Sequence, residues 1–251
     1  PNAIDAALIF QAARIPVRCG YDTDFRRPLL THPVRCTLTT KRLHQVRYYL
    51  NLLDALGVPA HGDQLELVTG DEARRQARAA LSVHRFDSTE KLLGINPGAA
   101  YGTAKRWHAA RFAQVADRIQ RDYGLRVVIF GSAGEHPVAA EVARKMRTPA
   151  TNLAGRTSLD EAMALIEQCR LFITNDSGLM HVAAALDVPL VAIFGPTNAA
   201  VTRPWSTVAN VVSDPVDCAP CMQRECPLGH HACMGYIDTE RVYGAAVALL
   251  A

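Results

Sequence analysis

One stretch of the chain, residues 171–186, changes its hydrophobic pattern halfway along. It begins with the short apolar run Leu171–Ile173, turns polar from Thr174 to Gly178, and then repeats apolar residues at helical spacing. This order predicts a strand, a tight turn and a helix. The new helix presents unpaired N–H groups at the positive end of its dipole, which suits a phosphate. We therefore predict that this turn binds a phosphate or diphosphate group.

From Lys91 to the C-terminal residues, short apolar runs typical of strands alternate with segments that have a helical period. Gly124 follows one helical period in the position of a C-cap, and Ser158 with Glu161 forms a capping-box pattern before another. Strands and helices that alternate in this way indicate an α/β fold, with a parallel sheet covered by helices on both faces. The predicted strands are 92–96, 125–130, 171–174 and 189–194, and the predicted helices are 109–123, 137–147, the segment after Ser158, 179–186, and 239–250 capped by Thr239.

The first third of the chain is less regular. Residues 6–13 predict a helix and residues 15–21 a strand, and residues 41–57 keep a helical period that ends at a glycine. A short polar helix is expected over 71–80. We place the domain boundary within 82–90, which gives an N-terminal domain of residues 1–85 and a C-terminal domain of residues 86–251.

Composition narrows the class of protein. The chain has 251 residues, 49% hydrophobic and 20% charged, as in a globular protein, and no apolar run is long enough to span a bilayer. The net charge is +3, and residues 1–50 are the basic part. That segment predicts either contact with an acidic substrate or membrane surface, or an ordinary solvated face. The chain opens with neither a Met nor a secretory signal pattern, so we expect it to begin inside a longer protein.

A second candidate loop, Asn96–Trp107, follows a predicted strand and precedes a predicted helix. Its glycines allow close approach of a ligand, and Lys105 and Arg106 supply cations for phosphate oxygens. The spacing is not that of a Walker A loop, and the chain has no G-x-G-x-x-G, which argues against a nucleoside triphosphatase and a standard dinucleotide dehydrogenase. The alternative is a flexible loop with surface cations. In a parallel sheet this loop and the turn at Asp176 share the carboxyl edge, where ligands bind.

Other strand-end residues have two interpretations each. Glu135 either accepts from ribose hydroxyls or stabilises a helix N-terminus. His181, one turn into its helix, is either structural or a phosphate or sugar ligand. Asp176 is a natural N-cap as well as a ligand candidate. The loop Phe194–Thr197 is a fourth strand-end loop, or only a turn.

Four of the seven cysteines, Cys218, Cys221, Cys226 and Cys233, fall close together near the C-terminus. Without a secretory pattern, disulfides are not the default. The spacing contains one C-x2-C pair and matches no standard zinc pattern. A structural metal, reduced or redox-active thiols, and disulfides all stay open. We interpret the cluster as a structural clip outside the catalytic site.

Taken together, these motifs resemble a known family. Asn96–Trp107, Phe130-Gly-Ser-Ala, Asn152-Leu-Ala-Gly and Thr174–Leu186, in this order, are similar to the ADP-heptose:lipopolysaccharide heptosyltransferases of glycosyltransferase family 9, and most of all to the heptosyltransferase II group. The resemblance implies a GT-B fold, in which two Rossmann-like domains face a cleft. This sequence would contain only part of the N-terminal Rossmann-like domain. It also implies inverting, metal-independent transfer of heptose from ADP-heptose to the lipopolysaccharide inner core, with no cofactor.

The resemblance also implies roles for particular residues. Lys105 would contact the diphosphate and stabilise departing ADP, Glu135 would contact the ribose, and Thr157 and Ser158 would border the adenine. Lys105 and Asp176 would be the catalytic residues. Asp176 would also hold the donor, in a site that includes Thr103, Ser177, Gly178 and His181. A cytoplasmic location, with peripheral contact at the inner membrane and no nucleic-acid partner, is expected.

One departure from the family concerns the N-terminus. Pro1-Asn2 matches a point inside the family's first domain, so the acidic residue expected to act as base is missing from this sequence. We expect these residues alone to bind the ADP-sugar but to transfer slowly or not at all. The basic region around Arg18, Tyr21, Arg26 and Arg27 is the candidate acceptor surface. A family 9 transferase with another donor or acceptor, and a nucleotide-sugar-binding fragment without catalysis, stay open.

Overall fold

The computed structural model describes residues 3–87 and 90–251. Internal contacts divide the chain into two compact units. The N-terminal unit consists of residues 1–63 with 200–202, and the C-terminal unit consists of residues 64–199 with 203–251. Pro1 and Asn2, which we match to a point inside the first domain of the heptosyltransferases, lie outside the described residues. No helix in the described part of the chain is both long and apolar enough to cross a membrane.

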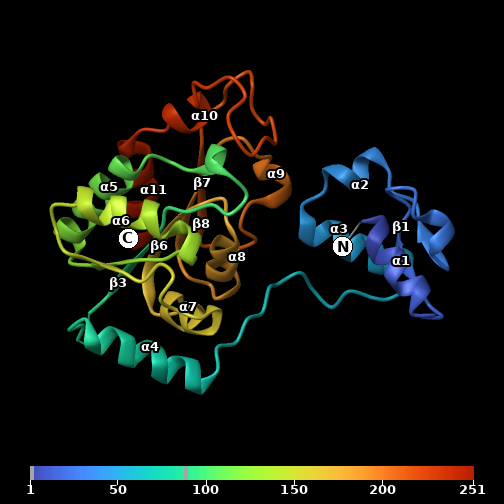
Figure 1. Ribbon diagram of the computed structural model, residues 1–251, viewed down its shortest axis with the longest axis horizontal. Helices are drawn as coiled ribbons and strands as arrows, with labels where there is room; N and C mark the ends of the chain where they lie inside the picture. Colours follow the sequence, from blue (N-terminus) through green and yellow to red (C-terminus); the bar gives the residue numbers. More distant parts are fainter. Residues whose placement is uncertain (1–2, 88–89) are drawn as a thin grey trace. The chain divides into compact units, whose positions relative to one another are not determined.

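The C-terminal unit is built on a six-stranded parallel sheet with the order β5-β4-β3-β6-β7-β8 (Figure 1). The chain starts in the middle at β3, moves outward to β5, and then returns to the other side of β3 with β6. This is the doubly wound arrangement of Rossmann-like domains, whose ligands bind where the strand order reverses. The strands are β3 (Leu92–Asn96), β4 (Arg126–Ile129), β5 (Ala150–Asn152), β6 (Cys169–Asn175), β7 (Leu190–Phe194) and β8 (Ala209–Ser213).

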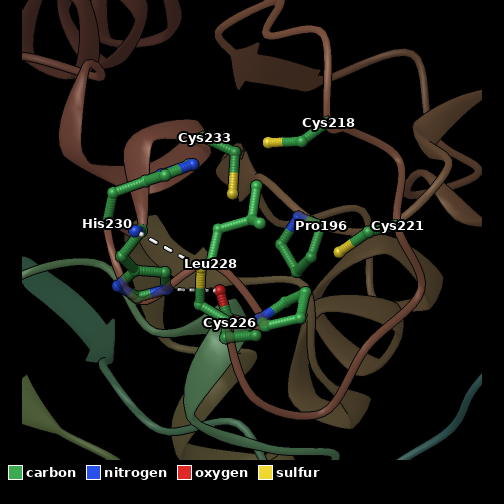
Figure 2. A pocket seen from close by; sticks show the side chains of 10 residues that line it. Pro196, Cys218, Cys221, Cys226, Leu228, His230 and Cys233 are labelled. Carbon is green, nitrogen blue, oxygen red and sulfur yellow. Dashed lines mark hydrogen bonds between the residues drawn. The ribbon is translucent and has the colours of Figure 1, made fainter.

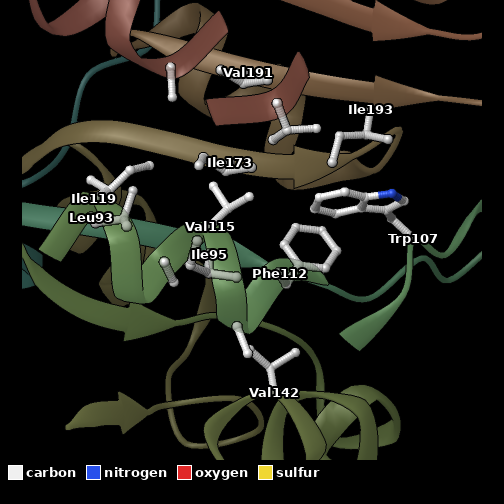
Figure 3. Close-up of a cluster of buried hydrophobic side chains, with 14 of the residues drawn as sticks. Leu93, Ile95, Trp107, Phe112, Val115, Ile119, Val142, Ile173, Val191 and Ile193 are labelled. Atoms are coloured by element: carbon white, nitrogen blue, oxygen red, sulfur yellow. The ribbon is translucent and has the colours of Figure 1, made fainter. Parts of the chain in front are cut away.

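Alternate residues of each strand point to opposite faces of the sheet, and each face has its own core. Leu93 and Ile95 of β3 belong to one cluster with Trp107 and Phe112, which Figure 3 shows packed together. Leu92 belongs to the other cluster. All five residues of β3 are buried, as expected for a central strand covered on both faces.

Helices supply the other half of each core. The first face packs against α5, α6 and α11, and the second against α4, α7 and α8. Their bounds are α4 (Asp71–Val83), α5 (Ala109–Tyr123), α6 (His136–Lys145), α7 (Leu159–Ile166), α8 (Gly178–Ala185) and α11 (Thr239–Leu250); the short elements are η2 (Thr103–Lys105), η3 (Ala133–Glu135), α9 (Ala199–Thr202) and α10 (Ala232–Gly235).

The N-terminal unit contains a two-stranded parallel sheet in which β1 pairs with β2. Tyr21, the last residue of β1, is buried, and its hydroxyl donates to the backbone oxygen of Tyr48 at 2.6 Å. The elements of this unit are α1 (Ile4–Ala12), β1 (Cys19–Tyr21), η1 (Arg27–Leu29), β2 (His32–Val34), α2 (Leu38–Arg42) and α3 (Gln45–Ala55).

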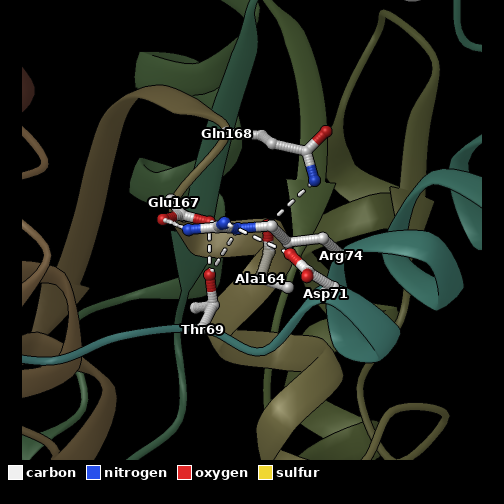
Figure 4. Close-up of polar contacts among 6 residues, drawn as sticks. All are labelled: Thr69, Asp71, Arg74, Ala164, Glu167 and Gln168. Carbon is white, nitrogen blue, oxygen red and sulfur yellow. Dashed lines mark hydrogen bonds and ion pairs between the residues drawn. The ribbon is translucent and has the colours of Figure 1, made fainter.

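Helix α4 belongs to the C-terminal unit, although the sequence boundary at residues 85/86 assigns it to the other one. Its apolar residues Ala73, Ala77 and Leu81 are four positions apart and enter the core that contains α7. The guanidinium of Arg74 donates from Nη2 and Nε to the two carboxylate oxygens of Glu167, at 2.8 and 3.0 Å (Figure 4). Contacts therefore place the division at residues 63/64, because an amphipathic helix is grouped by the face it buries.

Several predicted elements differ in detail. The helix predicted over 41–57 is two helices, α2 and α3, because Leu43 and His44 adopt extended backbone between them. The last helix is capped by Asp238, whose carboxylate accepts from the N–H of Arg241, and not by Thr239. The strand predicted over 15–21 is only β1. The short strands β5 and β8 are not predicted by the hydrophobic pattern.

Candidate functional site

The carboxyl edge of the central strands is the candidate site, because the strand order reverses between β3 and β6. Lys105 comes from the loop after β3, and Asp176 follows β6 directly. Nζ of Lys105 lies 2.6 Å from Oδ2 of Asp176, and the two side chains are only 13% and 7% exposed. The structure thus brings together the two residues that the sequence identifies as catalytic candidates.

A third strand-end loop joins this ion pair. The hydroxyl of Thr197, just beyond β7, donates to Oδ2 of Asp176 at 2.6 Å. A single carboxylate oxygen therefore accepts from both Lys105 and Thr197 and ties three loops together. From the sequence alone, the Phe194–Thr197 loop is either a fourth strand-end loop or only a turn. The sequence does not show which residue a polar side chain at a strand end will bind.

Two asparagines fix the loops that carry the ion pair. Asn96, at the end of β3, donates to the hydroxyl of Ser177 at 2.7 Å. Asn175, at the end of β6, donates to the backbone oxygen of Pro97 at 2.7 Å and accepts from the N–H of Trp107 at 3.1 Å. Both asparagines are buried, so these bonds are expensive to break. Their roles escape sequence reasoning because each partner is remote along the chain.

The N-terminus of α8 borders the ion pair. Its N-cap residue is Ser177, and the structure shows no side-chain hydrogen bond that caps the helix. The Asp176 carboxylate, for which N-capping was one interpretation, is instead bound to Lys105 and Thr197. The first backbone N–H groups of α8 consequently have no side-chain acceptor from the cap, and Gly178 is exposed at this end. This is the arrangement that favours an anion.

Glu135 lies on the neighbouring loop, after β4. Its Oε2 accepts from the N–H and the hydroxyl of Ser132, both at 2.8 Å, and forms a capping box. Its other oxygen faces Gly98 of the loop after β3 so closely that a Cβ at Gly98 would overlap it. The structure therefore gives Glu135 a structural role with one oxygen and places it beside the Lys105 loop.

The remaining predicted site residues lie on the same edge of the sheet. Ser158 is the N-cap of α7, and its hydroxyl accepts from the N–H of Glu161 at 3.2 Å, as its capping-box pattern predicts. Thr157 precedes it and is half-buried. Thr103 opens η2, two residues before Lys105, and is exposed. His181 is exposed in the first turn of α8.

The basic region of the N-terminal unit is only partly a surface. Tyr21 is fully buried, and Arg26 is 4% exposed and donates from Nε to the Tyr21 backbone oxygen at 2.7 Å. Arg18 donates to a backbone oxygen of its own unit at 2.7 Å, and Arg27 is exposed beside Asp22. Tyr21 and Arg26 therefore stabilise the unit itself, which leaves Arg18 and Arg27 as the accessible cations of this group.

The fold can be compared with those of solved protein structures. The crystal structure of E. coli ADP-heptose lps heptosyltransferase II superposes with a TM-score of 0.79 at 33% identity, over 100% of this chain and 74% of that one. A glycosyltransferase family 9 protein from Veillonella parvula DSM 2008 superposes with a TM-score of 0.83 at 32% identity, over 97% and 70%. The fold is therefore that of a GT-B glycosyltransferase.

Sequence comparison defines the family. Residues 1–232 match the profile of glycosyltransferase family 9 (heptosyltransferase), and the chain belongs to this family. It is 37% identical to lipooligosaccharide heptosyltransferase 2 of Campylobacter jejuni over 216 residues, which are 84% of this chain and 65% of that enzyme. The chain thus spans about two thirds of the length of this relative.

Proposed function

We propose that the protein is an inverting glycosyltransferase that moves heptose from ADP-heptose to a heptose of the lipopolysaccharide inner core. One observation carries the proposal: the buried Lys105–Asp176 pair lies beside the open N-terminus of α8, at the switch point of the sheet. The E. coli relative with this fold is an ADP-heptose lps heptosyltransferase. Work at the cytoplasmic face of the inner membrane, where sugar nucleotides are available, would follow from this activity.

On the donor side, the chemistry is the departure of ADP. As the acceptor hydroxyl oxygen bonds to the anomeric carbon and loses its proton to the acidic base of the family's first domain, the bond between the anomeric carbon and the β-phosphate oxygen breaks, and that oxygen takes the negative charge. The Lys105 ammonium and the first N–H groups of α8 meet this charge as it develops, which lowers the barrier. No metal is needed for this role, since the ammonium and the helix terminus supply the positive field.

Asp176 acts differently from its neighbours. An ionised carboxylate only accepts hydrogen bonds and repels a diphosphate, so it is unsuited to hold the phosphates itself. We assign it to orienting Lys105 and Thr197, with heptose hydroxyls as further donors to its oxygens. The N–H groups that follow Ser177 and Gly178 then bind the diphosphate, and His181 lies one turn further along the same helix.

The adenosine side uses the loops after β4 and β5. Glu135 keeps Oε2 in its capping box and offers Oε1 to the ribose hydroxyls, next to Gly98. Thr157 and Ser158 begin the α7 turn on the next loop and border the adenine. The capping role of Glu135 and its ligand role are compatible because they use different oxygens.

The test compares donors and then measures transfer. Calorimetry with the chain should give tighter binding of ADP-heptose than of ADP-glucose or a UDP-sugar. Residues 1–251 alone should transfer heptose slowly or not at all to an inner-core lipopolysaccharide acceptor that ends in a single heptose. The same chain joined to the part of the family's first domain that carries the acidic base should add one heptose and release one ADP. Preference for a UDP-sugar would overturn the donor assignment and favour a family 9 enzyme with another substrate. Donor binding without any transfer even when that part is present would favour a nucleotide-sugar-binding fragment.

A further inference from the structure

The segment Cys218–Cys233, which we call the cysteine segment, has no hydrophobic core of its own. Residues 214–231, between β8 and α10, contain neither helix nor strand, and none of their side chains is buried. Irregular stretches of this length are uncommon in compact domains unless they have a function. Folded units below about 40 residues, which bury little apolar surface, usually need disulfides, a metal ion or oligomerisation.

The four thiols of this segment surround one small cavity. The cavity has a volume of about 20 Å³, which is room for roughly one water-sized particle, and Cys218, Cys221, Cys226 and Cys233 all line it. Figure 2 shows their sulfur atoms around Leu228 and Pro196. His230 and His231 also line the cavity, and no carboxylate does. Thiolates and imidazoles select soft or borderline metals such as Zn²⁺ over Mg²⁺ or Ca²⁺.

The backbone of the segment approaches one of the thiols. The N–H of His231 points to Sγ of Cys226 at 3.4 Å. All four cysteines are free thiols in the structure. The thiolate is the form that binds metal ions.

The side chains are not yet arranged as ligands. Among residues 3–87 and 90–251, no group of three or more Cys, His, Asp or Glu is placed to hold a metal ion in this structure. Ligation therefore requires the thiols to rotate inward and the exposed side chain of Leu228 to leave the space between them. The thiols would turn about their Cα–Cβ bonds, and all four cysteines already line the same cavity.

We propose that Cys218, Cys221, Cys226 and Cys233 bind one Zn²⁺ ion, and that this ion locks the cysteine segment onto the loop that carries Lys105. On binding, each thiol loses its proton to solvent, and four S–Zn bonds form in a closed tetrahedral site. The ion has no open coordination position and takes no part in the transfer reaction. Its effect on donor binding is mechanical.

The lock follows from contacts between the segment and the Lys105 loop. The backbone N–H of Ala104 donates to the backbone oxygen of Arg224 at 3.0 Å, and Arg224 donates from Nε to the backbone oxygen of Tyr101 at 2.7 Å. The His231 ring donates from Nε2 to the backbone oxygen of Ala104 at 2.7 Å. Ala104 immediately precedes Lys105, so a loosened cysteine segment would free the Lys105 loop.

The experiment measures metal and thiols on the intact chain. Purified with Zn²⁺ under reducing conditions, the protein should retain about one equivalent of zinc after desalting. A strong chelator should release it and make four more thiols reactive toward a thiol reagent. Cys226→Ser should lose most of the zinc. Cys19→Ser, which removes an exposed thiol of β1 outside the cluster, should keep it.

A second measurement tests the link to Lys105, and this arm alone rests on the proposed function. Removing zinc should weaken ADP binding roughly tenfold, the equivalent of about one lost hydrogen bond, and adding Zn²⁺ back should restore it. Substoichiometric zinc with four reactive thiols, or two disulfides under reducing conditions, would overturn the metal site. Bound zinc whose removal leaves the ADP affinity unchanged would overturn the lock. Wild-type protein that binds zinc but not ADP would instead refute the donor assignment.

Discussion

Lys105 and Asp176 are 71 positions apart in the sequence, and their side chains meet at 2.6 Å. The contact exists because β3 and β6 are hydrogen-bonded neighbours, in the register that pairs Asn96 with Thr174. Both strands end at the same level, and each ends with a buried asparagine. Asn96 of β3 binds the loop after β6, and Asn175 of β6 binds the loop after β3. The site is therefore a property of the sheet order as much as of either loop.

Lys105→Met should weaken ADP binding, and it should also lower stability, because it leaves the buried Asp176 carboxylate without its counterion. Loss of a charge-assisted hydrogen bond to phosphate costs about 1.5–3 kcal/mol, or roughly 10- to 100-fold in affinity. Calorimetry with ADP measures the effect. Lys91→Met, which removes an exposed lysine just before β3, is the matched control and should bind as the wild type does. Equal loss of affinity in both variants would show that Lys105 has no specific role.

Asp176→Ala should reduce both stability and ADP affinity. It leaves the Lys105 ammonium buried without its counterion, and breaking a buried pair costs about 3–5 kcal/mol of unfolding free energy. Thermal denaturation with and without ADP measures both effects. Asp54→Ala removes an exposed carboxylate of α3 and should change neither. A destabilised variant with unchanged ADP affinity would restrict Asp176 to a structural role.

Gly102→Ala should displace the Lys105 loop. A Cβ at Gly102 would overlap the backbone oxygen of Arg224, and backbone cannot move aside cheaply. We expect a lower melting temperature and weaker ADP binding. Gly244→Ala is the opposite control: its Cβ would enter open space within α11, where alanine favours the helix by about 0.5–1 kcal/mol. Wild-type behaviour of the Gly102 variant would contradict the tight packing of the two loops.

Glu135→Ala and Ser132→Ala together separate capping from ligand binding. Both changes break the same capping box and should lower stability by about 1 kcal/mol. Only the change at Glu135 removes Oε1, so only this variant should lose affinity for ADP. Affinity for inorganic diphosphate, which has no ribose, should be the same in the two variants. Equal ADP affinities would leave Glu135 as a helix cap alone.

Glu167→Gln should weaken the attachment of α4 to α7. Hydrogen bonds from Arg74 and then Thr69 hold the pKa of the Glu167 carboxyl below its ordinary value of 4.5. A lowered folded pKa contributes stability that is present above the unfolded value and disappears as the pH falls through the folded value. The melting-temperature difference between wild type and variant should therefore be largest near neutral pH and vanish in acid.

The control for this pH dependence is Glu72→Gln. Arg75 also lowers the pKa of Glu72, but this pair is exposed to solvent, which screens it. We expect no change in melting temperature at any pH. A pH-independent difference for the Glu167 variant would show that packing, and not its charge, holds α4.

Local features of the site were predictable from the sequence because they depend on neighbours along the chain. The strand, turn and helix of 171–186 correspond to β6 and α8. Gly124 follows α5 in the left-handed conformation, and Ser158 caps α7. Apolar spacing, glycine at a C-cap and the capping box act within a few residues. The sequence could also place Lys105 and Asp176 at one edge of the sheet, since parallel strands share that edge.

Only the tertiary structure determines which remote residues contact one another. Asp176 could serve equally as a helix cap by its sequence position, and the arrival of Lys105 and Thr197 determines its actual bonds. Likewise, α4 is assigned by the core that receives Ala77 and Leu81, and not by its place before the predicted boundary. The physical reason is common to both cases. Hydrogen bonds and apolar burial between remote residues depend on strand order, and strand order is not encoded in any local window of the sequence.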